Sequence, residues 1–199
     1  MSATKKRVLS IDLGTKNLAF CVLERGFEGG EPRTTVLRWG ILNVHGALKK
    51  SKKTPTISEL NRALQETLAK ETLEEGVDLV AIENQPAGFH KRANTKMKTL
   101  SHCIEAYMWH RLPSKQIRFV NPKSKFSFSD KDEVARVAKL KKSSERYKEH
   151  KRMACEATQR MIESPSLWLA DTGLMDMWTA SKKKDDLADC FLQGLYVLG

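Results

Sequence analysis

Residues 7–25 read RVLSIDLGTKNLAFCVLER, and this stretch decides the fold. Its first part, 7–13, is mostly apolar and predicts a strand that ends at Gly14. Its second part, 17–25, predicts another strand after a three-residue turn. Two strands joined by so short a connection pair antiparallel, because a parallel pair needs a long crossover.

The rest of the chain adds strands and helices in alternation. A loop with four turn-forming residues (Gly26, Gly29, Gly30 and Pro32) separates the second strand from the third. The expected strands are 7–13, 17–25, 34–45, 77–83 and 117–120. The expected helices are 58–75, capped by Ser58 and ended by Gly76, then 93–111, 147–163 and 184–197. Residues 49–56 predict a basic linker, and 123–144 a polar, lysine-rich stretch.

This order, β-β-β-α-β-α-β-α-α, predicts an α/β fold in one domain over residues 1–199. We expect a five-stranded mixed sheet whose first three strands are antiparallel, with helices on both faces. The chain length is that of about one domain with its own core.

The composition favours a polyanionic partner. The chain has 35 Lys and Arg against 24 Asp and Glu, a net charge of +11, which attracts nucleic acid. No apolar run is long enough for a membrane span, and the first strand begins too early for a secretory signal. The four cysteines form no CxxC pair, so we expect free thiols in a reducing, intracellular compartment.

Five acidic residues stand where catalysis would need them. Asp12 and Glu83 come at the carboxyl ends of expected strands, and Asp185, Asp186 and Asp189 begin the last helix. A carboxylate at the end of a buried strand is costly unless a cation neutralises it. Mg²⁺ accepts such oxygens, and two ions can activate a water and stabilise a leaving oxygen.

Taken singly, some of these residues could serve the fold rather than catalysis. Asp185 and Asp186 could merely favour the positive end of the helix dipole, and Asp12 could be only a turn residue before Gly14. Asp189 lies a turn further into the helix, where a capping role fails. The combination of all five is more specific than any member.

Three segments carry a family resemblance: IDLGTKN at 11–17, IENQ at 82–85 and KKDDLAD at 183–189. They resemble the motifs of RuvC-type Holliday junction resolvases, above all those of poxviruses, other large DNA viruses and fungal mitochondria. The resemblance implies an RNase H-like fold, a homodimer and two Mg²⁺ (or Mn²⁺) ions per active site. It also implies an endodeoxyribonuclease that makes paired symmetric nicks in four-way DNA junctions during DNA recombination and repair.

The resemblance also implies roles for the acidic residues. Asp12 would bridge both ions, Glu83 would bind one, and Asp186 with Asp189 the other, with Asp185 as a substitute for Asp186. Relatives place a lysine near the site after the fifth strand, which Lys123 or Lys125 would supply. A viral chain would act in host cytoplasm or nucleus, and a fungal one in the mitochondrion.

Basic clusters predict the DNA-binding surface, because lysine contacts phosphate without reading sequence. The candidates are Lys91, Arg92, Lys96, Lys98, Lys123, Lys125, Lys141, Lys142, Lys151, Arg152, Lys182, Lys183 and Lys184. Phe126 and Phe128 are either wedges against bases or anchors of their loop. The apolar stripe of the 93–111 helix fits either core or, by the resemblance, a dimer interface.

Three other functions remain open at this point. An actin-like ATPase fragment shares the strand order and a DLGT turn, but it needs a second domain and a nucleotide cofactor for which this chain has neither the length nor the glycines. A nuclease acting on RNA–DNA hybrids or precursor ribosomal RNA has the same carboxylates. A non-catalytic junction-binding protein would have no use for them.

Overall fold

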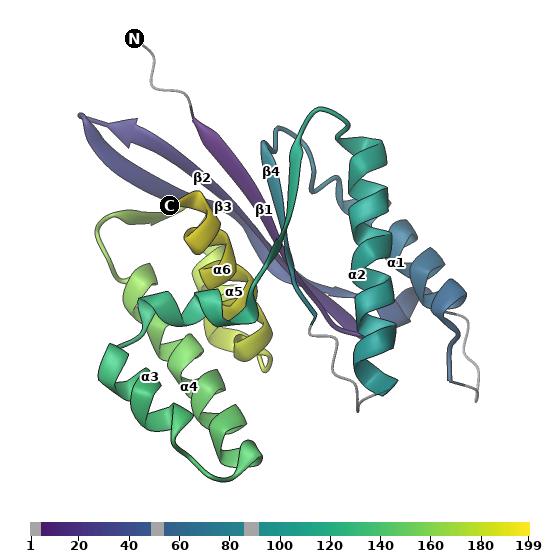
Figure 1. Cartoon of the computed structure of the whole chain (residues 1–199). Helices are drawn as coiled ribbons and strands as arrows, with labels where there is room; N and C mark the ends of the chain where they lie inside the picture. Colours follow the sequence, from purple (N-terminus) through teal and green to yellow (C-terminus); the bar gives the residue numbers. More distant parts are fainter. Residues whose placement is uncertain (1–4, 49–53, 86–91) are drawn as a thin grey trace.

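The computed structural model describes residues 5–48, 54–85 and 92–199, with side chains from residue 95 onward in the last range. It is a six-stranded sheet with helices on both faces (Figure 1). The strands are β1 (Lys6–Leu13), β2 (Asn17–Glu28), β3 (Glu31–Asn43), β4 (Leu79–Glu83), β5 (Gln116–Val120) and β6 (Leu167–Leu169). The helices are α1 (Ile57–Glu71), α2 (Arg92–Arg111), α3 (Lys131–Ala138), α4 (Ser143–Ile162), α5 (Gly173–Ala180) and α6 (Lys184–Leu198), with short 3-10 helices η1 (Val44–Ala47) and η2 (Pro122–Phe128).

The sheet has the predicted mixed topology. Its strand order is β5-β4-β1-β2-β3-β6. The first three strands are antiparallel neighbours, while β4 runs parallel to β1 and β5 parallel to β4. The α/β fold with an antiparallel start is therefore confirmed.

The prediction of five strands was wrong by one. β6 pairs parallel with β3 through only three residues, which is too short for an alternating pattern to signal it. The polar stretch 123–144 also holds most of η2 and the whole of α3, neither of which was expected. α5 was likewise not expected.

The loop predicted between the second and third strands is much shorter than expected. β2 and β3 continue as a long hairpin to a two-residue turn at Gly29 and Gly30, whose φ angles are 60° and 90°. Both angles lie in the left-handed region that glycine adopts without strain. Gly26 and Pro32 pair inside the strands instead.

The first helix begins before the residue that the sequence suggested. Thr56 is its N-cap, and its hydroxyl accepts a hydrogen bond from the Glu59 amide at 3.2 Å. The Glu59 carboxylate accepts one from the Thr56 amide at 2.8 Å, which completes a capping box. Ser58 was therefore the wrong cap, and the helix ends at Glu71, ahead of the predicted Gly76.

The sheet separates two hydrophobic cores because its side chains alternate between faces. Leu9, Ile11 and Leu13 of β1 pack toward α1 and α2, whereas Val8 packs toward α4, α5 and α6. On α2, the buried side chains of Leu100, Ile104 and Met108 join the first of these cores, with Met97 and Leu112 packed against it. This confirms the core interpretation of the α2 stripe. No helix within the described ranges is long and apolar enough to cross a membrane.

Candidate active site

The carboxyl ends of three parallel strands meet at one edge of the sheet. Ile11 of β1 is level with Ile82 of β4, so the following residues, Asp12 and Glu83, lie side by side. Strand alternation turns both toward the face that α6 covers, because Val8 and Ala81 face that core. Glu83 is in turn level with Val120 at the end of β5. The register of the sheet thus brings Asp12 and Glu83 together, as the sequence predicted.

The turn after Asp12 requires the glycine that follows. The Gly14 amide donates a hydrogen bond to the Asn17 carbonyl oxygen at 2.8 Å. A Cβ atom on residue 14 would lie 2.9 Å from that same oxygen, closer than such contacts allow. Gly14 therefore lets the chain reverse tightly and keeps Asp12 at the strand end.

The start of α6 brings the remaining acidic residues to this edge. Asp186 and Asp189 are three residues apart and share one face of the helix. The pKa of Asp12 is raised well above its usual value, first by burial and then by the charges of Glu83 and Asp189, with a contribution from Asp186. Asp12 therefore lies in the combined field of three other carboxylates.

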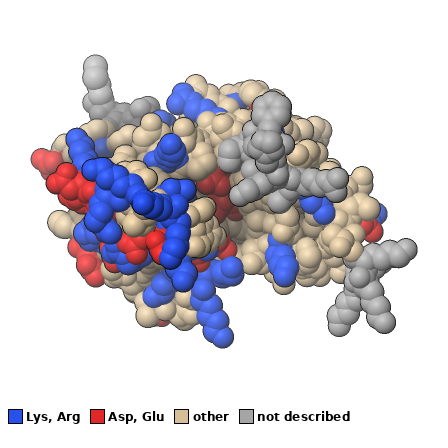
Figure 2. Space-filling view, turned by 60° about the horizontal axis from the view of Figure 1, so that its bottom comes forward, with Lys and Arg blue, Asp and Glu red and all other residues tan. Residues whose placement is uncertain are grey.

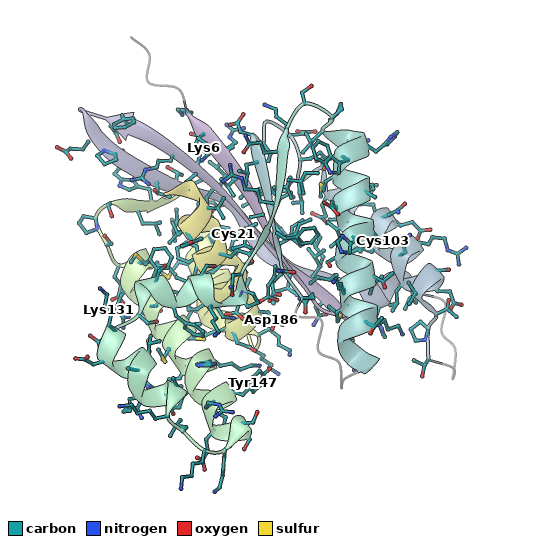
Figure 3. The ribbon with its side chains drawn as sticks, in the orientation of Figure 1. Lys6, Cys21, Cys103, Lys131, Tyr147 and Asp186 are labelled. Carbon is teal, nitrogen blue, oxygen red and sulfur yellow. The ribbon has the colours of Figure 1, made fainter. Side chains whose placement is uncertain are left out.

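These groups line a cleft of about 980 Å³. Figure 2 shows acidic atoms within the hollow and a concentration of Lys and Arg on the lobe beside it, formed by α3 and α4. Figure 3 shows Asp186 near the ends of the strands, and Tyr147 reaches the same cleft from α4. The charged lining consists of Asp12, Glu83, Asp185, Asp186, Asp189, Lys16, Lys123, Lys125, Lys151 and Lys183.

Lys125 of η2 lies among the carboxylates. Its ammonium donates a hydrogen bond to Asp189 and forms an ion pair with it. Burial lowers the pKa of Lys125, but the hydrogen bond to Asp189 and the charges of Asp189, Glu83 and Asp12 outweigh this effect and raise it. Of the two lysines that the sequence left open, Lys125 contacts the acidic cluster, while Lys123 lines the cleft as an exposed residue.

The adjacent carboxylates of α6 have different partners. Asp185 forms an ion pair with Lys151 of α4, which lowers its pKa although burial opposes the shift. The pKa of Asp186 is raised, first by burial and then by the charge of Asp185. Its nearest basic partner, Lys183, is 3.9 Å away. The charge of Asp186 thus contributes to the raised pKa of Asp12. Asp185 is instead paired with Lys151.

One face of α4 contributes two cleft residues that sequence reasoning missed, Tyr147 and His150. They share this helix face with Lys151, a predicted DNA-binding residue, at spacings of three and four, and all three line the cleft. The Lys151 ammonium lies 4.6 Å from the centre of the Tyr147 ring. The spacing was visible in the sequence, but nothing local indicated that this face points toward Asp12.

The two phenylalanines of η2 are held by the protein. The Phe126 ring packs on His150 with ring centres 4.6 Å apart, at the wall of the cleft. Phe128 packs against the core beneath α6. Both contacts support the anchoring interpretation.

The predicted DNA-binding residues differ in their surroundings. Lys123, Lys125, Lys151 and Lys183 line the cleft. Arg152 is engaged by the carboxylates of Glu133, Glu149 and Glu156. Lys96 donates to the Pro55 carbonyl, Lys184 lies 5.5 Å from the Trp178 ring, and Lys142 pairs with Glu145. Lys98, Lys141 and Lys182 are exposed, while Lys91 and the side chain of Arg92 lie outside the described residues.

The chemistry of the carboxylates fits a hard divalent cation. In the described ranges, no three His, Cys, Asp or Glu side chains are already arranged to hold one. Lys125 and Lys151 neutralise Asp189 and Asp185 instead. Burial, followed by the charges of Glu83 and Asp189, raises the pKa of Asp12, and these carboxylates are oxygen ligands of the kind that Mg²⁺ prefers. Lys125 would compete with such an ion for Asp189.

Comparison with known proteins identifies the family. The sequence profile of the Ydc2 catalytic family, described as mitochondrial resolvase Ydc2 / RNA splicing MRS1, matches residues 8–167. The chain belongs to this family. Membership of this family decides against the ATPase alternative, which the strand order alone could not exclude.

A viral protein is similar in sequence. The uncharacterized protein L451 of Acanthamoeba polyphaga mimivirus is 30% identical over 132 residues. The match covers 62% of this chain and 29% of L451, so this member of the Ydc2 family spans less than a third of that relative's length.

Solved resolvases share the fold of this Ydc2-family chain. The yeast mitochondrial Holliday junction resolvase Ydc2 superposes with a TM-score of 0.63 at 16% identity, over 96% of this chain and 79% of that one. RuvC of T. thermophilus, in complex with a Holliday junction substrate, gives 0.58 at 13% identity, over 96% and 91%. The fowlpox virus Holliday junction resolvase gives 0.57 at 14% identity, over 96% and 97%. The predicted RuvC-type fold is therefore confirmed.

Proposed function

We propose that this protein is a metal-dependent endonuclease that resolves four-way DNA junctions. One observation carries the proposal: Asp12 and Glu83 lie side by side at strand ends and share a cleft with Asp186 and Asp189. Membership of a family described by a mitochondrial resolvase supports the substrate. The basic surface beside the cleft supports a nucleic-acid partner.

The acidic residues would hold the metal ions. Asp12 lies beside Glu83 and shares the cleft with Asp186 and Asp189, so it would be a ligand of these ions. Glu83 would bind one, and Asp186 with Asp189 the other. When bound, two Mg²⁺ ions, or Mn²⁺ in their place, supply an activated water and stabilise the leaving oxygen. The partner that Asp185 has in Lys151 favours Asp186 as the ligand.

Basic and aromatic side chains around the carboxylates would hold the DNA strand. Lys151 and Lys183 stand at the wall of the cleft, where they would contact phosphates flanking the scissile bond. Lys125 would offset the charge of Asp189 until a metal ion arrives and then face the phosphate. The exposed ring of Tyr147 offers a stacking surface to an unpaired base at the branch point.

Paired symmetric nicks need two active sites. One cleft holds the carboxylates for one phosphodiester bond, and a four-way junction has two equivalent strands to cut. A homodimer with twofold symmetry would present two clefts to these strands.

The same family description includes an RNA splicing protein, which favours a second candidate. In that case the basic surface would bind structured RNA, and the carboxylates would have no catalytic role. A complete set of four acidic residues in the cleft argues for cleavage, because unused carboxylates would repel phosphate.

A cleavage assay separates these functions. The protein is incubated with a labelled four-way DNA junction, a duplex of equal length, an RNA–DNA hybrid and a structured RNA, each with Mg²⁺ and with EDTA. We expect metal-dependent symmetric nicking of the junction alone, with ends that DNA ligase reseals. The Asp12→Asn variant should bind the junction as wild type does and leave it uncut. Cleavage of the hybrid, or binding of RNA without metal-dependent cleavage of any substrate, would refute the proposal.

A further inference from the structure

Gln193 is a buried polar residue in the middle of α6, only 4% exposed. Its side-chain NH2 group has two hydrogens and lies within hydrogen-bond distance of three acceptors, so one hydrogen is shared: the Ser10 hydroxyl at 3.0 Å, and the carbonyl oxygens of Ile11 and Ala81, both at 3.2 Å. Ser10 and Ile11 belong to β1, and Ala81 belongs to β4. One side chain therefore joins α6 to both strands whose ends carry Asp12 and Glu83.

The position of Gln193 on the helix is matched to the acidic residues. Asp186, Asp189 and Gln193 are spaced at i, i+3 and i+7, which places all three on one helix face. The Ile11 carbonyl belongs to the peptide that leads directly into Asp12. Gln193 thus contacts the sheet about 6 Å along the helix axis from Asp189.

The helix approaches the sheet closely at this level. A Cβ atom on Gly194 would lie 2.7 Å from Leu23 Cδ1 and 3.1 Å from Ser10 Cβ. The absence of a side chain on Gly194 therefore lets α6 lie close to the sheet beside the Gln193 amide without displacing Leu23. A separate hydrogen bond, from Trp39 Nε1 to the Leu187 carbonyl, holds α6 to β3, which carries no acidic residue of the site.

The buried apolar side chains of α6 are close-packed and hold the helix against the sheet. Hydrophobic burial is itself non-directional, so it specifies the orientation of the helix less sharply than hydrogen bonds do. Hydrogen bonds weaken steeply with changed angle and distance. The bonds of Gln193 therefore fix the rotation and height of α6 relative to β1 and β4.

We propose that Gln193 is a positioning residue that holds Asp186 and Asp189 of α6 in register with Asp12 and Glu83 of the sheet. This role rests on the metal site of the proposed function and not on junction cleavage, because the register matters only where the four carboxylates share metal ions. Functional groups must stay within about 0.5 Å of their productive geometry. Loss of the amide should therefore change metal binding and cleavage more than it changes the fold.

The test uses Gln193→Met, which keeps the length of the side chain and removes its hydrogen bonds. Isothermal titration calorimetry with Mn²⁺ should show affinity weakened by about 10–100-fold, the range typical of residues that orient metal ligands. The Mn²⁺ concentration for half-maximal junction cleavage should rise by the same factor. Junction affinity in EDTA should be unchanged, since no DNA-facing group is altered.

The matched control is Leu68→Ala, a buried side chain of α1 on the opposite face of the sheet. It should lower the melting temperature at least as much as Gln193→Met and leave Mn²⁺ affinity unchanged. Ser10→Ala, which removes one of the three acceptors, should weaken Mn²⁺ binding by about threefold if each bond contributes about 0.7 kcal/mol. This second variant carries the test if Gln193→Met does not fold.

The outcomes separate this inference from the proposed function. If the wild type cleaves junctions but Gln193→Met binds Mn²⁺ as tightly, the positioning role is overturned and the function stands. If the wild type binds Mn²⁺ without cutting, and the variant binds it weakly, the function fails and the positioning role stands. Equal Mn²⁺ affinity losses in Leu68→Ala and Gln193→Met would also overturn it, because general destabilisation would then explain both.

Discussion

Replacing Lys125 with Met removes the ammonium group from the acidic cleft but keeps most of the apolar stem. The side chains of Lys125 and Asp189 are only 15% and 24% exposed. Without the ammonium, Asp189 loses its ion-pair partner, and Asp12 and Glu83 lose a nearby positive charge. The metal-free protein should therefore become less stable.

The size of the loss follows from the burial of this ion pair. Removing one partner of a fully buried pair costs about 3–5 kcal/mol, and the remaining solvent contact here reduces the cost to about 2–3 kcal/mol. For a chain of this length, each kcal/mol lowers the melting temperature by about 2–4 °C. We expect a decrease of about 5–10 °C in EDTA.

A divalent metal ion should restore the lost stability. An ion at a hundred times its dissociation constant adds about 2.7 kcal/mol to the stability of the state that binds it. In the wild type, part of this gain is spent in displacing Lys125, whereas the Lys125→Met cleft has no competing cation. Mn²⁺ should therefore raise the melting temperature of the variant more than that of wild type.

Thermal melts in EDTA and in Mn²⁺, followed by circular dichroism, measure both effects. Lys123→Met is the control, because Lys123 lines the same cleft but is exposed, and its loss should change stability by less than about 0.5 kcal/mol. Equal melting temperatures of Lys125→Met and wild type in EDTA would refute the reasoning. So would a deficit that Mn²⁺ leaves unchanged.

Three further predictions concern other parts of the molecule. The pKa of Asp12 is raised on folding by burial and neighbouring carboxylates. Its stabilising contribution is therefore fully present below the unfolded pKa of about 3.9 and is lost as pH rises through the folded value. In EDTA at pH 7, the Asp12→Asn variant should therefore be more stable than wild type by about 1 kcal/mol. Denaturant titrations should show this difference shrinking toward pH 4, and a difference that does not change with pH would contradict the argument. In cleavage assays, Asp186→Asn should lower the rate by more than about 100-fold. Asp185→Asn should lower it by only about tenfold, the effect of losing an orienting partner, because Asp185 pairs with Lys151. Equal losses would argue against assigning the metal to Asp186 rather than Asp185. Thr56→Ala removes the capping box of α1 and should lower the free energy of unfolding by about 1 kcal/mol, measured in thermal melts, without changing the cleavage rate. A slower cleavage rate would contradict this and connect α1 to the site.

The sequence alone determined the elements that carry the acidic residues. The strands ending at Asp12 and Glu83 were predictable because burial on both faces gives continuous apolar runs, a local signal. Asp186 and Asp189 were assigned to one helix face from their spacing. The antiparallel start followed from the short turn at Gly14. The roles of these residues as metal ligands stay predictions.

Only the tertiary structure decided which residues meet at the site. Lys125 rather than Lys123 contacts Asp189, because the 3-10 helix that follows β5 turns the second lysine inward. The pairing of Lys151 with Asp185 joins residues 34 positions apart and depends on how α4 crosses α6. β6 gave no pattern, since three residues are too few for one. Gln193 showed no recognisable pattern either. A glutamine among apolar neighbours has the same local sequence whether its side chain faces solvent or three buried acceptors. Local periodicity determines whether each segment forms a helix or a strand. These contacts depend instead on the angle and position at which the helices pack on the sheet, which no single segment encodes.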